Sequence, residues 1–261
     1  MSRDWDAVTY DQLPLPHQEW GEGVLGKLEL NGDEAVLDAG CGIGRDVEML
    51  LERLPNGRVI AVDGSAQMLS AARNRINDKT GRVAWLLADL SSALPIAVPV
   101  DACVSVATFH WIKNHEALFA NLATVMRSGA QFVFDAGGKG NIPNVMDAIR
   151  RAAPEVYEKV DAQSWMWEFA DGETTAARLD KAGFDVTEAI LRPHPIRVDD
   201  PNVLRRFLKA AILGGYLDQM IPEKRDDFVE KVADAMTEPV VDYVRLEVDD
   251  RFGQDRKSTR L

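Results

Sequence analysis

Short apolar runs alternate with amphipathic segments through the first half of the chain. The run at 34–38 ends in Asp38, and the run at 58–62 is followed by Asp63. Between the two runs, residues 45–54 carry apolar side chains at helical spacing. Strand, helix and strand within about thirty residues indicate a βαβ unit, whose connection is right-handed.

The same alternation continues towards the C-terminus. It predicts further strands at 83–87, 102–107, 131–135, 184–191 and 240–248, and helices at 65–76, 116–126, 144–153, 174–181, 202–219 and 223–236. This rhythm is typical of a mostly parallel sheet with helices on both faces. We therefore expect a single α/β domain over 1–261, with a Rossmann-like, mostly parallel seven-stranded sheet and a helical cap formed by about 1–25, 141–170 and 200–238.

Composition narrows the function classes. The formal charge of −12 disfavours nucleic acid as a partner, because a phosphate backbone would be repelled. No apolar stretch approaches the roughly 18 residues of a membrane span, and the polar N-terminal residues do not resemble a secretion signal. Cys41 and Cys103 show no metal-ligand spacing. We expect a cytoplasmic monomer or homodimer that binds no metal, no membrane and no nucleic acid.

A glycine loop follows the first predicted strand. It contains Gly40, Gly42 and Gly44 and is preceded by Asp38. The dinucleotide fingerprint G-x-G-x-x-G requires a third glycine where this chain has Arg45 or Val47, which disfavours a nicotinamide cofactor. The pattern instead resembles the first motif of the class I S-adenosylmethionine (SAM)-dependent methyltransferases.

That resemblance implies a cofactor site along the carboxyl ends of the strands. The acid before the loop and the loop itself would bind the methionyl end, and Asp63, nineteen residues after Gly44, would accept hydrogen bonds from the ribose hydroxyls. The adenine would lie near Met68 and Asp89. Each assignment has an alternative. The glycine loop could be an ordinary turn and Asp63 a helix-capping acid. Met68 could be a core residue and Asp89 a solvated acid. The complete set of expected cofactor residues is Asp38, Gly40, Cys41, Gly42, Gly44, Asp63, Gly64, Met68, Asp89, Leu90 and Ala107.

A His-Trp pair, His110 and Trp111, follows the fourth strand and resembles the trans-aconitate methyltransferase group and the insect juvenile-hormone-acid methyltransferases. The likeness extends to Tyr10 and Gln18 near the N-terminus and to the segments 179–184 and 217–223. Two departures are Ser128-Gly129-Ala130, where Pro-Gly-Gly is usual, and the absence of a Phe-Pro-Arg-like stretch in the last strand.

The resemblance implies methyl transfer to a carboxylate oxygen or another small anionic acceptor, for which no general base is required. Gln18 and Trp111 would hold the acceptor or close over it, and we class them with His110 as catalytic candidates. His110 has two open roles: a base for a phenol, alcohol or amine, or a structural histidine bonded to backbone. Glu19 is a base candidate only for a carbon nucleophile, and His17, His115 and His194 are expected at the surface or in the cap.

The candidate substrate residues are Tyr10, Gln18, His110, Trp111, Trp167, Arg197 and Arg205. The two arginines come from a basic group at 192–209, where an anionic acceptor could find partners, although a solvated basic face is the alternative. Trp167 could line an apolar pocket or belong to the core of the cap. We expect methylation of a small anionic acceptor, carboxylate favoured. One alternative is methylation of another small metabolite, such as an isoprenoid diphosphate or a natural-product intermediate. The other is a SAM-binding protein that has no catalytic activity.

Overall fold

Seven strands form one sheet in the order β3-β2-β1-β4-β5-β7-β6, in which β7 runs antiparallel to both neighbours. The computed structural model describes residues 7, 11, 16–161 and 166–253, apart from the side chains of residues 18 and 159–161. The predicted mostly parallel α/β sheet is confirmed. Its strands are β1 (Ala35–Ala39), β2 (Arg58–Asp63), β3 (Val83–Leu87), β4 (Val100–Val106), β5 (Met126–Gly137), β6 (Phe184–Arg197) and β7 (Val240–Phe252).

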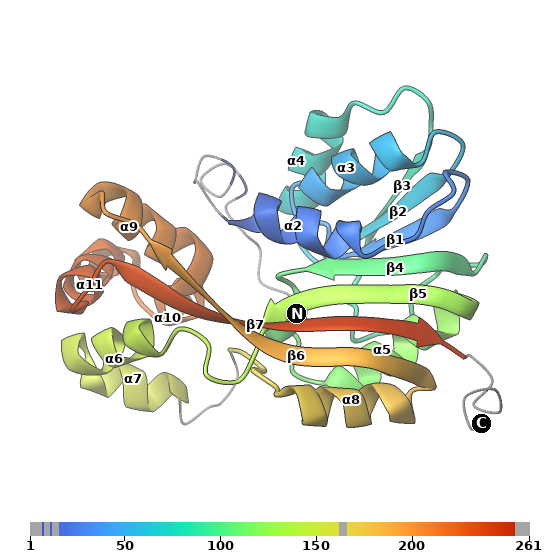
Figure 1. Cartoon of the computed structure of the whole chain (residues 1–261). Coiled ribbons are helices and arrows are strands. Elements are labelled where there is room, and N and C mark those ends of the chain that lie inside the picture. Colours follow the sequence, from blue (N-terminus) through green and yellow to red (C-terminus); the bar gives the residue numbers. More distant parts are fainter. Residues whose placement is uncertain (1–6, 8–10, 12–15, 162–165, 254–261) are drawn as a thin grey trace.

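Helices cover both faces of this sheet (Figure 1). One face carries α2 (His17–Gly26), α3 (Arg45–Arg53) and α4 (Ala66–Ile76), and the other carries α5 (His115–Val125) and α8 (Gly172–Lys181). Because side chains alternate along a strand, neighbouring residues of β1 enter different cores. Val36 packs with the first set of helices and Leu37 with the second, and both are fully buried.

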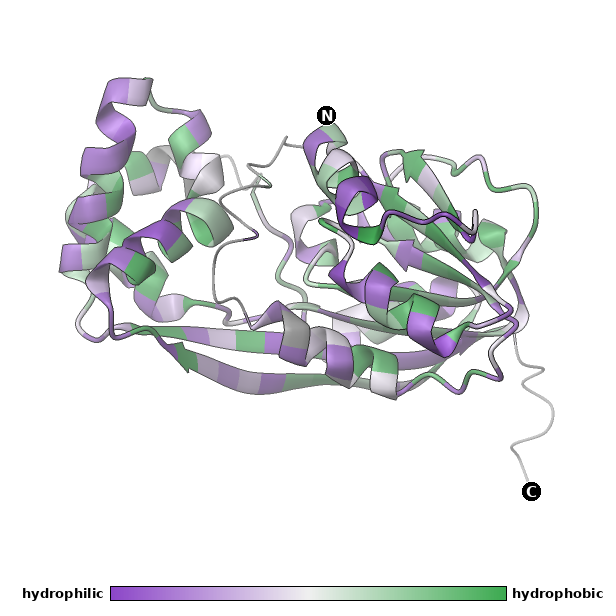
Figure 2. Cartoon of the chain, turned by 90° about the horizontal axis from the view of Figure 1, so that it is seen from above, coloured by the Kyte–Doolittle hydropathy of each residue, from purple (hydrophilic) through white to green (hydrophobic). Residues whose placement is uncertain are grey.

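The remaining helices form a lobe beyond the carboxyl ends of the parallel strands. The helical lobe contains α6 (Pro143–Ala152), α7 (Pro154–Asp161), α9 (Pro201–Phe207), a π-helical turn (Leu208–Ile212), α10 (Gly214–Asp218) and α11 (Pro222–Ala235). The long strands β6 and β7 run from the sheet into this lobe (Figure 1). Figure 2 shows the lobe beside the sheet from another direction, its helices carrying hydrophobic bands next to hydrophilic ones.

Two local predictions need correction. The expected continuous helix over 202–219 is broken by the π turn and by a second short helix, α10, which starts at Gly214. A Cβ atom on Gly215 would lie 1.9 Å from Sδ of Met166, so glycine allows this close packing. The strands β6 and β7 are longer than expected because they pair from Phe184–Phe252 to Arg197–Val240. No helix among the described residues is long and apolar enough to cross a membrane.

Candidate active site

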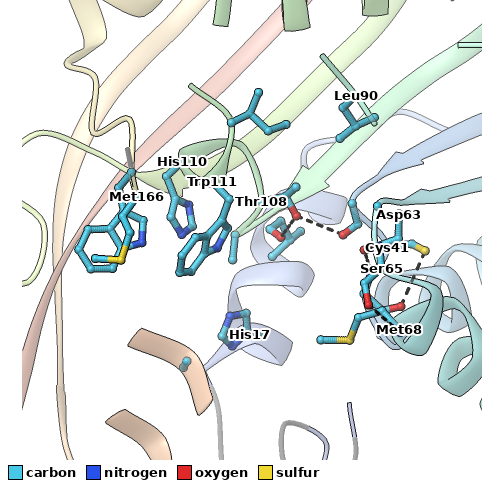
Figure 3. A pocket seen from close by; sticks show the side chains of 18 of the residues that line it. His17, Cys41, Asp63, Ser65, Met68, Leu90, Thr108, His110, Trp111 and Met166 are labelled. Atoms are coloured by element: carbon cyan, nitrogen blue, oxygen red, sulfur yellow. Dashed lines mark hydrogen bonds between the residues drawn. The ribbon is translucent and has the colours of Figure 1, made fainter. Parts of the chain in front are cut away.

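A cavity of about 860 Å³ lies between the carboxyl ends of the parallel strands, α2 and the helical lobe. Its size is typical of a small-molecule site, and its position is where open α/β sheets bind their ligands. The loops after β1, β2, β3 and β4 all reach it. In Figure 3, Asp63, Ser65 and Met68 lie on one side, whereas His110, Trp111 and Met166 lie on the other. We call these sides the cofactor end and the acceptor end.

Glycine is required in the first loop by close packing. Gly40 has φ +92°, and a Cβ atom there would lie 2.3 Å from the side chain of Thr108. The N–H groups of Gly40 and Cys41 both donate to the carbonyl oxygen of Val62, at 2.8 and 2.9 Å. The loop backbone is thereby pulled against β2, and Gly40, Cys41 and Gly42 border the cavity directly. Gly44, with φ +83°, lies behind them and does not line it.

Asp63 at the end of β2 joins this loop to α4. Its Oδ2 accepts from the N–H of Gly42 at 2.9 Å, and its Oδ1 accepts from the N–H of Ser65 at 2.8 Å. Ser65 in turn caps α4, because its Oγ accepts from the N–H of Met68 at 3.2 Å. Asp63, Gly64 and Met68 all line the cavity. A carboxylate oxygen can accept more than one hydrogen bond, which is compatible with Asp63 also accepting hydrogen bonds from ribose hydroxyls.

Buried carboxyl groups gather at the cofactor end. Asp38 is fully buried just behind the cavity wall, and neither carboxylate oxygen finds a hydrogen-bond partner in the described part of the chain. Burial, with Asp46 and Asp63 nearby, raises the pKa of Asp38. Asp46 lines the cavity, and burial together with Asp135 raises its pKa to about 7, although Arg45 opposes the shift. Buried carboxylates are normally paired, so this end fits a cationic ligand. SAM carries an ammonium group and a sulfonium and meets that requirement.

The third and fourth strands complete the cofactor end. Asp89 follows β3 and accepts from the N–H and Oγ of Ser91, at 2.9 and 2.6 Å, which lowers its pKa. Asp89, Leu90 and Ala107 line the cavity. Ala107 has φ +53°, a strained value for a residue with a side chain, and its N–H donates to Oδ1 of Asp135 at 3.0 Å. This turn directs the chain after β4 into the cavity.

Aromatic rings form the acceptor end. Trp111 and Trp167 have ring centres 5.8 Å apart, and Trp167 stacks on Phe169 at 5.4 Å. The ring of His110 lies 5.2 Å from that of Trp111 and 6.0 Å from that of Phe169. These side chains come from the segment after β4 and from residues 166–170, which the fold brings together. The sequence left open whether Trp167 lines a pocket, and the structure places it in the cavity wall.

The hydrogen bonds of His110 fix its proton. Nδ1 accepts from the N–H of Gly137 at 3.1 Å, and burial lowers the pKa of the imidazole well below 6.5. The ring is therefore neutral, with its hydrogen on Nε2. Nε2 has no partner among the described residues, and the side chain lines the cavity. His110 can donate a hydrogen bond to a ligand in this state but cannot remove a proton from one at Nε2.

Sequence reasoning missed Arg245 on β7. It lines the cavity although only 2% of it is exposed, and its Nε donates to Oδ2 of Asp135 at 2.9 Å. Its Cζ lies 3.9 Å from the centre of the Trp20 ring, a cation–π contact. The available signal was the position of Arg245 in the strand alternation, because it continues the inward-facing series of Val241 and Tyr243. His17, expected at the surface or in the cap, also lines the cavity, and burial followed by Arg245 and Arg45 lowers its pKa to about 3.

Two predicted substrate residues lie away from the cavity. The Nε of Arg197 donates to Asp199 at 2.7 Å, and Nη2 of Arg205 lies 3.4 Å from Asp234. These arginines do not line the cavity because they turn towards acidic neighbours at the surface, so their assignment to the acceptor is corrected. Tyr10 lies outside the described residues, as does the side chain of Gln18.

Similarity to known proteins agrees with this geometry. Residues 36–129 match a family described as a methyltransferase domain. Over 236 residues the chain is 31% identical to the trans-aconitate 2-methyltransferase of Rhodopseudomonas palustris (strain BisB18), covering 85% of this chain and 86% of that protein. The chain belongs to the class I SAM-dependent methyltransferases, in the trans-aconitate methyltransferase-like group. This enzyme family uses SAM as its cofactor.

Two further similarities cover a shorter region or have a lower identity. The trans-aconitate 2-methyltransferase of Azoarcus sp. (strain BH72) is 34% identical over 125 residues, so the chain spans only 47% of that relative's length. A solved structure of Haemonchus contortus phosphoethanolamine N-methyltransferase 2 contains phosphomonomethylethanolamine and S-adenosylhomocysteine. It matches with a TM-score of 0.56 and 17% identity, covering 90% of this chain and 53% of that one, which shows a shared fold.

Proposed function

We propose that this methyltransferase transfers the methyl group of SAM to a carboxylate oxygen of a small organic acid. The state of His110 carries the proposal. Its Nδ1 is occupied by the N–H of Gly137 and its Nε2 carries a hydrogen, so the histidine after β4 is a donor rather than a base. A phenol, alcohol or ammonium group would have to lose a proton before it could react. A carboxylic acid, with a pKa of about 4, is already ionised at neutral pH.

The cofactor end supplies the binding groups that SAM requires. In this proposal Asp38 and Asp46 supply the negative charge that faces the ammonium and sulfonium, and Asp63 accepts the ribose hydroxyls. Asp89 and Leu90 lie where the adenine amino group and ring nitrogen would be bound. The glycine loop allows the methionyl chain to approach the backbone closely, because no side chain fits between Gly40 and Thr108.

The reaction needs no proton transfer. Bound SAM supplies an electrophilic methyl group, so that the carboxylate O–C bond forms as the C–S bond breaks and the electron pair remains on sulfur. The protein contributes orientation and exclusion of water. His110 Nε2–H orients the acceptor, and the rings of Trp111 and Trp167 cover it. Two of the relatives are trans-aconitate 2-methyltransferases, which supports a carboxylate acceptor.

The test is a screen of carboxylic acids and their primary amides with saturating SAM, followed by mass spectrometry of the methylated product. We expect methyl esters and equimolar S-adenosylhomocysteine from the acids and nothing from the amides. We also expect kcat to vary little between pH 6 and 9, because no protein group must accept a proton. Methylation confined to phenols, amines or isoprenoid diphosphates would overturn the proposal, as would a pH limb near neutrality that disappears in His110→Asn.

A further inference from the structure

Three cationic side chains line the cavity among the described residues, and they differ in how well they could bind an anionic acceptor. Arg45 contacts Oδ1 of Asp11 at 3.2 Å, and Lys113 donates to the carbonyl oxygen of Trp167 at 2.5 Å. Arg45 lies at the start of α3, next to the glycine loop and therefore at the cofactor end. Arg245 is on β7, beside the end of β5, and belongs to the acceptor end. Lys113 also reaches the acceptor end, but it is exposed and bonded to the carbonyl oxygen of Trp167, so Arg245 is the buried cation that an acceptor anion would meet there.

The hydrogen-bond capacity of Arg245 is largely unused. A guanidinium has five N–H donors. Nε donates to Oδ2 of Asp135, and Nη2 lies 2.9 Å from the same oxygen without forming a second well-directed hydrogen bond. No other hydrogen-bond partner of the guanidinium occurs among the described residues. A guanidinium that is 2% exposed, borders a cavity and has unused donors is suited to an acceptor supplied by a ligand.

The guanidinium is also fixed in position. Asp135 is held by the N–H of Ala107, and the ring of Trp20 lies 3.9 Å from the Cζ of Arg245. Arg245 pairs in register with Gly137, whose N–H holds His110. The two donors of the acceptor end are therefore tied to the same residue of β5. Such pre-organised donors suit a planar carboxylate, which Arg can bind with two parallel hydrogen bonds.

The surroundings limit the rest of the acceptor. Trp111, Trp167, Phe169 and Met166 line the same part of the cavity and offer apolar surface. A second or third carboxylate would face these rings, and an unpaired buried charge is costly. An alkyl or aryl group would instead gain hydrophobic contact there.

We propose that Arg245 binds the carboxylate of the acceptor and that the acceptor is a monocarboxylic acid with an apolar alkyl or aryl body. This inference rests on the proposed function and adds a specificity-determining residue to it. Each carboxylate oxygen keeps a lone pair when bound by Arg245, so an oxygen of the bound group remains able to attack the methyl carbon.

The test compares matched acids on the full-length enzyme. Hexanoate and 3-phenylpropionate serve as monocarboxylates, and adipate and trans-aconitate serve as polycarboxylates, with kcat/KM measured from S-adenosylhomocysteine release. We expect kcat/KM for the monocarboxylates to exceed that for the polycarboxylates by about tenfold or more, because a polycarboxylate would leave an unpaired charge facing the rings. A preference for adipate or trans-aconitate would overturn the inference that the acceptor has an apolar body.

Variants of Arg245 test whether this residue binds the acceptor carboxylate. Arg245→Met should lower kcat/KM for the monocarboxylates roughly a hundredfold, mainly through KM, and Arg245→Lys should retain part of it. Arg245→Met leaves the buried Asp135 without its partner, which could destabilise the fold. The double variant Asp135→Asn/Arg245→Met removes both charges and so avoids an unpaired buried carboxylate. Arg192→Met is the matched control, because Arg192 pairs in register with Arg245 but is exposed and outside the cavity lining.

Cofactor titrations separate the outcomes. The Arg245 variants should bind S-adenosylhomocysteine within about threefold of the wild type, since the inference assigns Arg245 to the acceptor. Loss of that binding with methylthioadenosine binding retained would place Arg245 on the cofactor's own carboxylate and overturn the inference. Equal effects of the Arg245 and Arg192 variants would also overturn it. If the wild type methylates no carboxylic acid, the proposed function fails, and this inference falls with it.

Discussion

Replacing Asp46 with asparagine should stabilise the ligand-free protein at pH 8. Asp46 lies in the first turn of α3, and its Oδ1 is buried without a hydrogen-bond partner among the described residues. Burial and Asp135 raise its pKa from 3.8 to about 7. The folded state therefore keeps a proton that the unfolded chain releases, so stability falls as pH rises from about 4 to about 7.

The magnitude follows from that shift. About three pKa units at 1.36 kcal/mol each give roughly 4 kcal/mol of destabilisation above pH 7. This figure is an upper bound, because the carboxylate borders a cavity that water can enter and because Asp38 titrates with it. Asparagine keeps the shape and removes the charge. The gain should be small near pH 4 and grow through pH 7.

Urea denaturation of the ligand-free protein at pH 4.5 and pH 8 measures this gain. Glu48→Gln is the control, because Glu48 is in the same helical turn but exposed, so both variants lose a similar interaction with the helix dipole. Glu48 also loses its ion pair with Arg75 at 3.6 Å, a surface pair worth at most about 1 kcal/mol. Asp250, whose pKa is also raised to about 7, titrates in every variant and cancels in the comparison. The reasoning is refuted if Asp46→Asn and Glu48→Gln change the free energy of unfolding equally at pH 8.

Two predictions concern the cofactor end. Asp63→Ala should weaken SAM binding by roughly 10²-fold or more, because two charged hydrogen bonds of about 1.5–3 kcal/mol each are lost; calorimetric titration measures this, and unchanged affinity would remove Asp63 from the ribose site. Gly40→Ala should destabilise the protein and abolish SAM binding, because its Cβ would meet Thr108 at 2.3 Å. Gly42→Ala, which meets nothing within 4 Å, should cost only the strain of its φ of +51°, about 1 kcal/mol or slightly more; equal losses of thermal stability would contradict the packing argument.

Local sequence was sufficient for the sheet and for the meeting of the loops after β1, β2 and β3 at one cavity. Alternating strands and helices require a parallel sheet, and the carboxyl ends of such strands meet at one edge. Gly40, Asp63 and Asp89 therefore converge on one cavity once the strand order is given. Ser65 could be read as the start of α4 because a helix cap depends on residues within one turn.

Only the tertiary structure decided the acceptor end. Arg245, Asp135 and Trp20 are more than a hundred residues apart in sequence, and they meet because β7 inserts antiparallel beside β5 beneath α2. The proton on His110 depends on the backbone of Gly137, and the outward direction of Arg197 depends on the nearby Asp199. Residue type and spacing determine turns, caps and strand ends because those interactions are local. The register and packing of whole strands and helices decide which distant side chains meet in one buried volume. The arginine of β7 reaches the cavity for this reason.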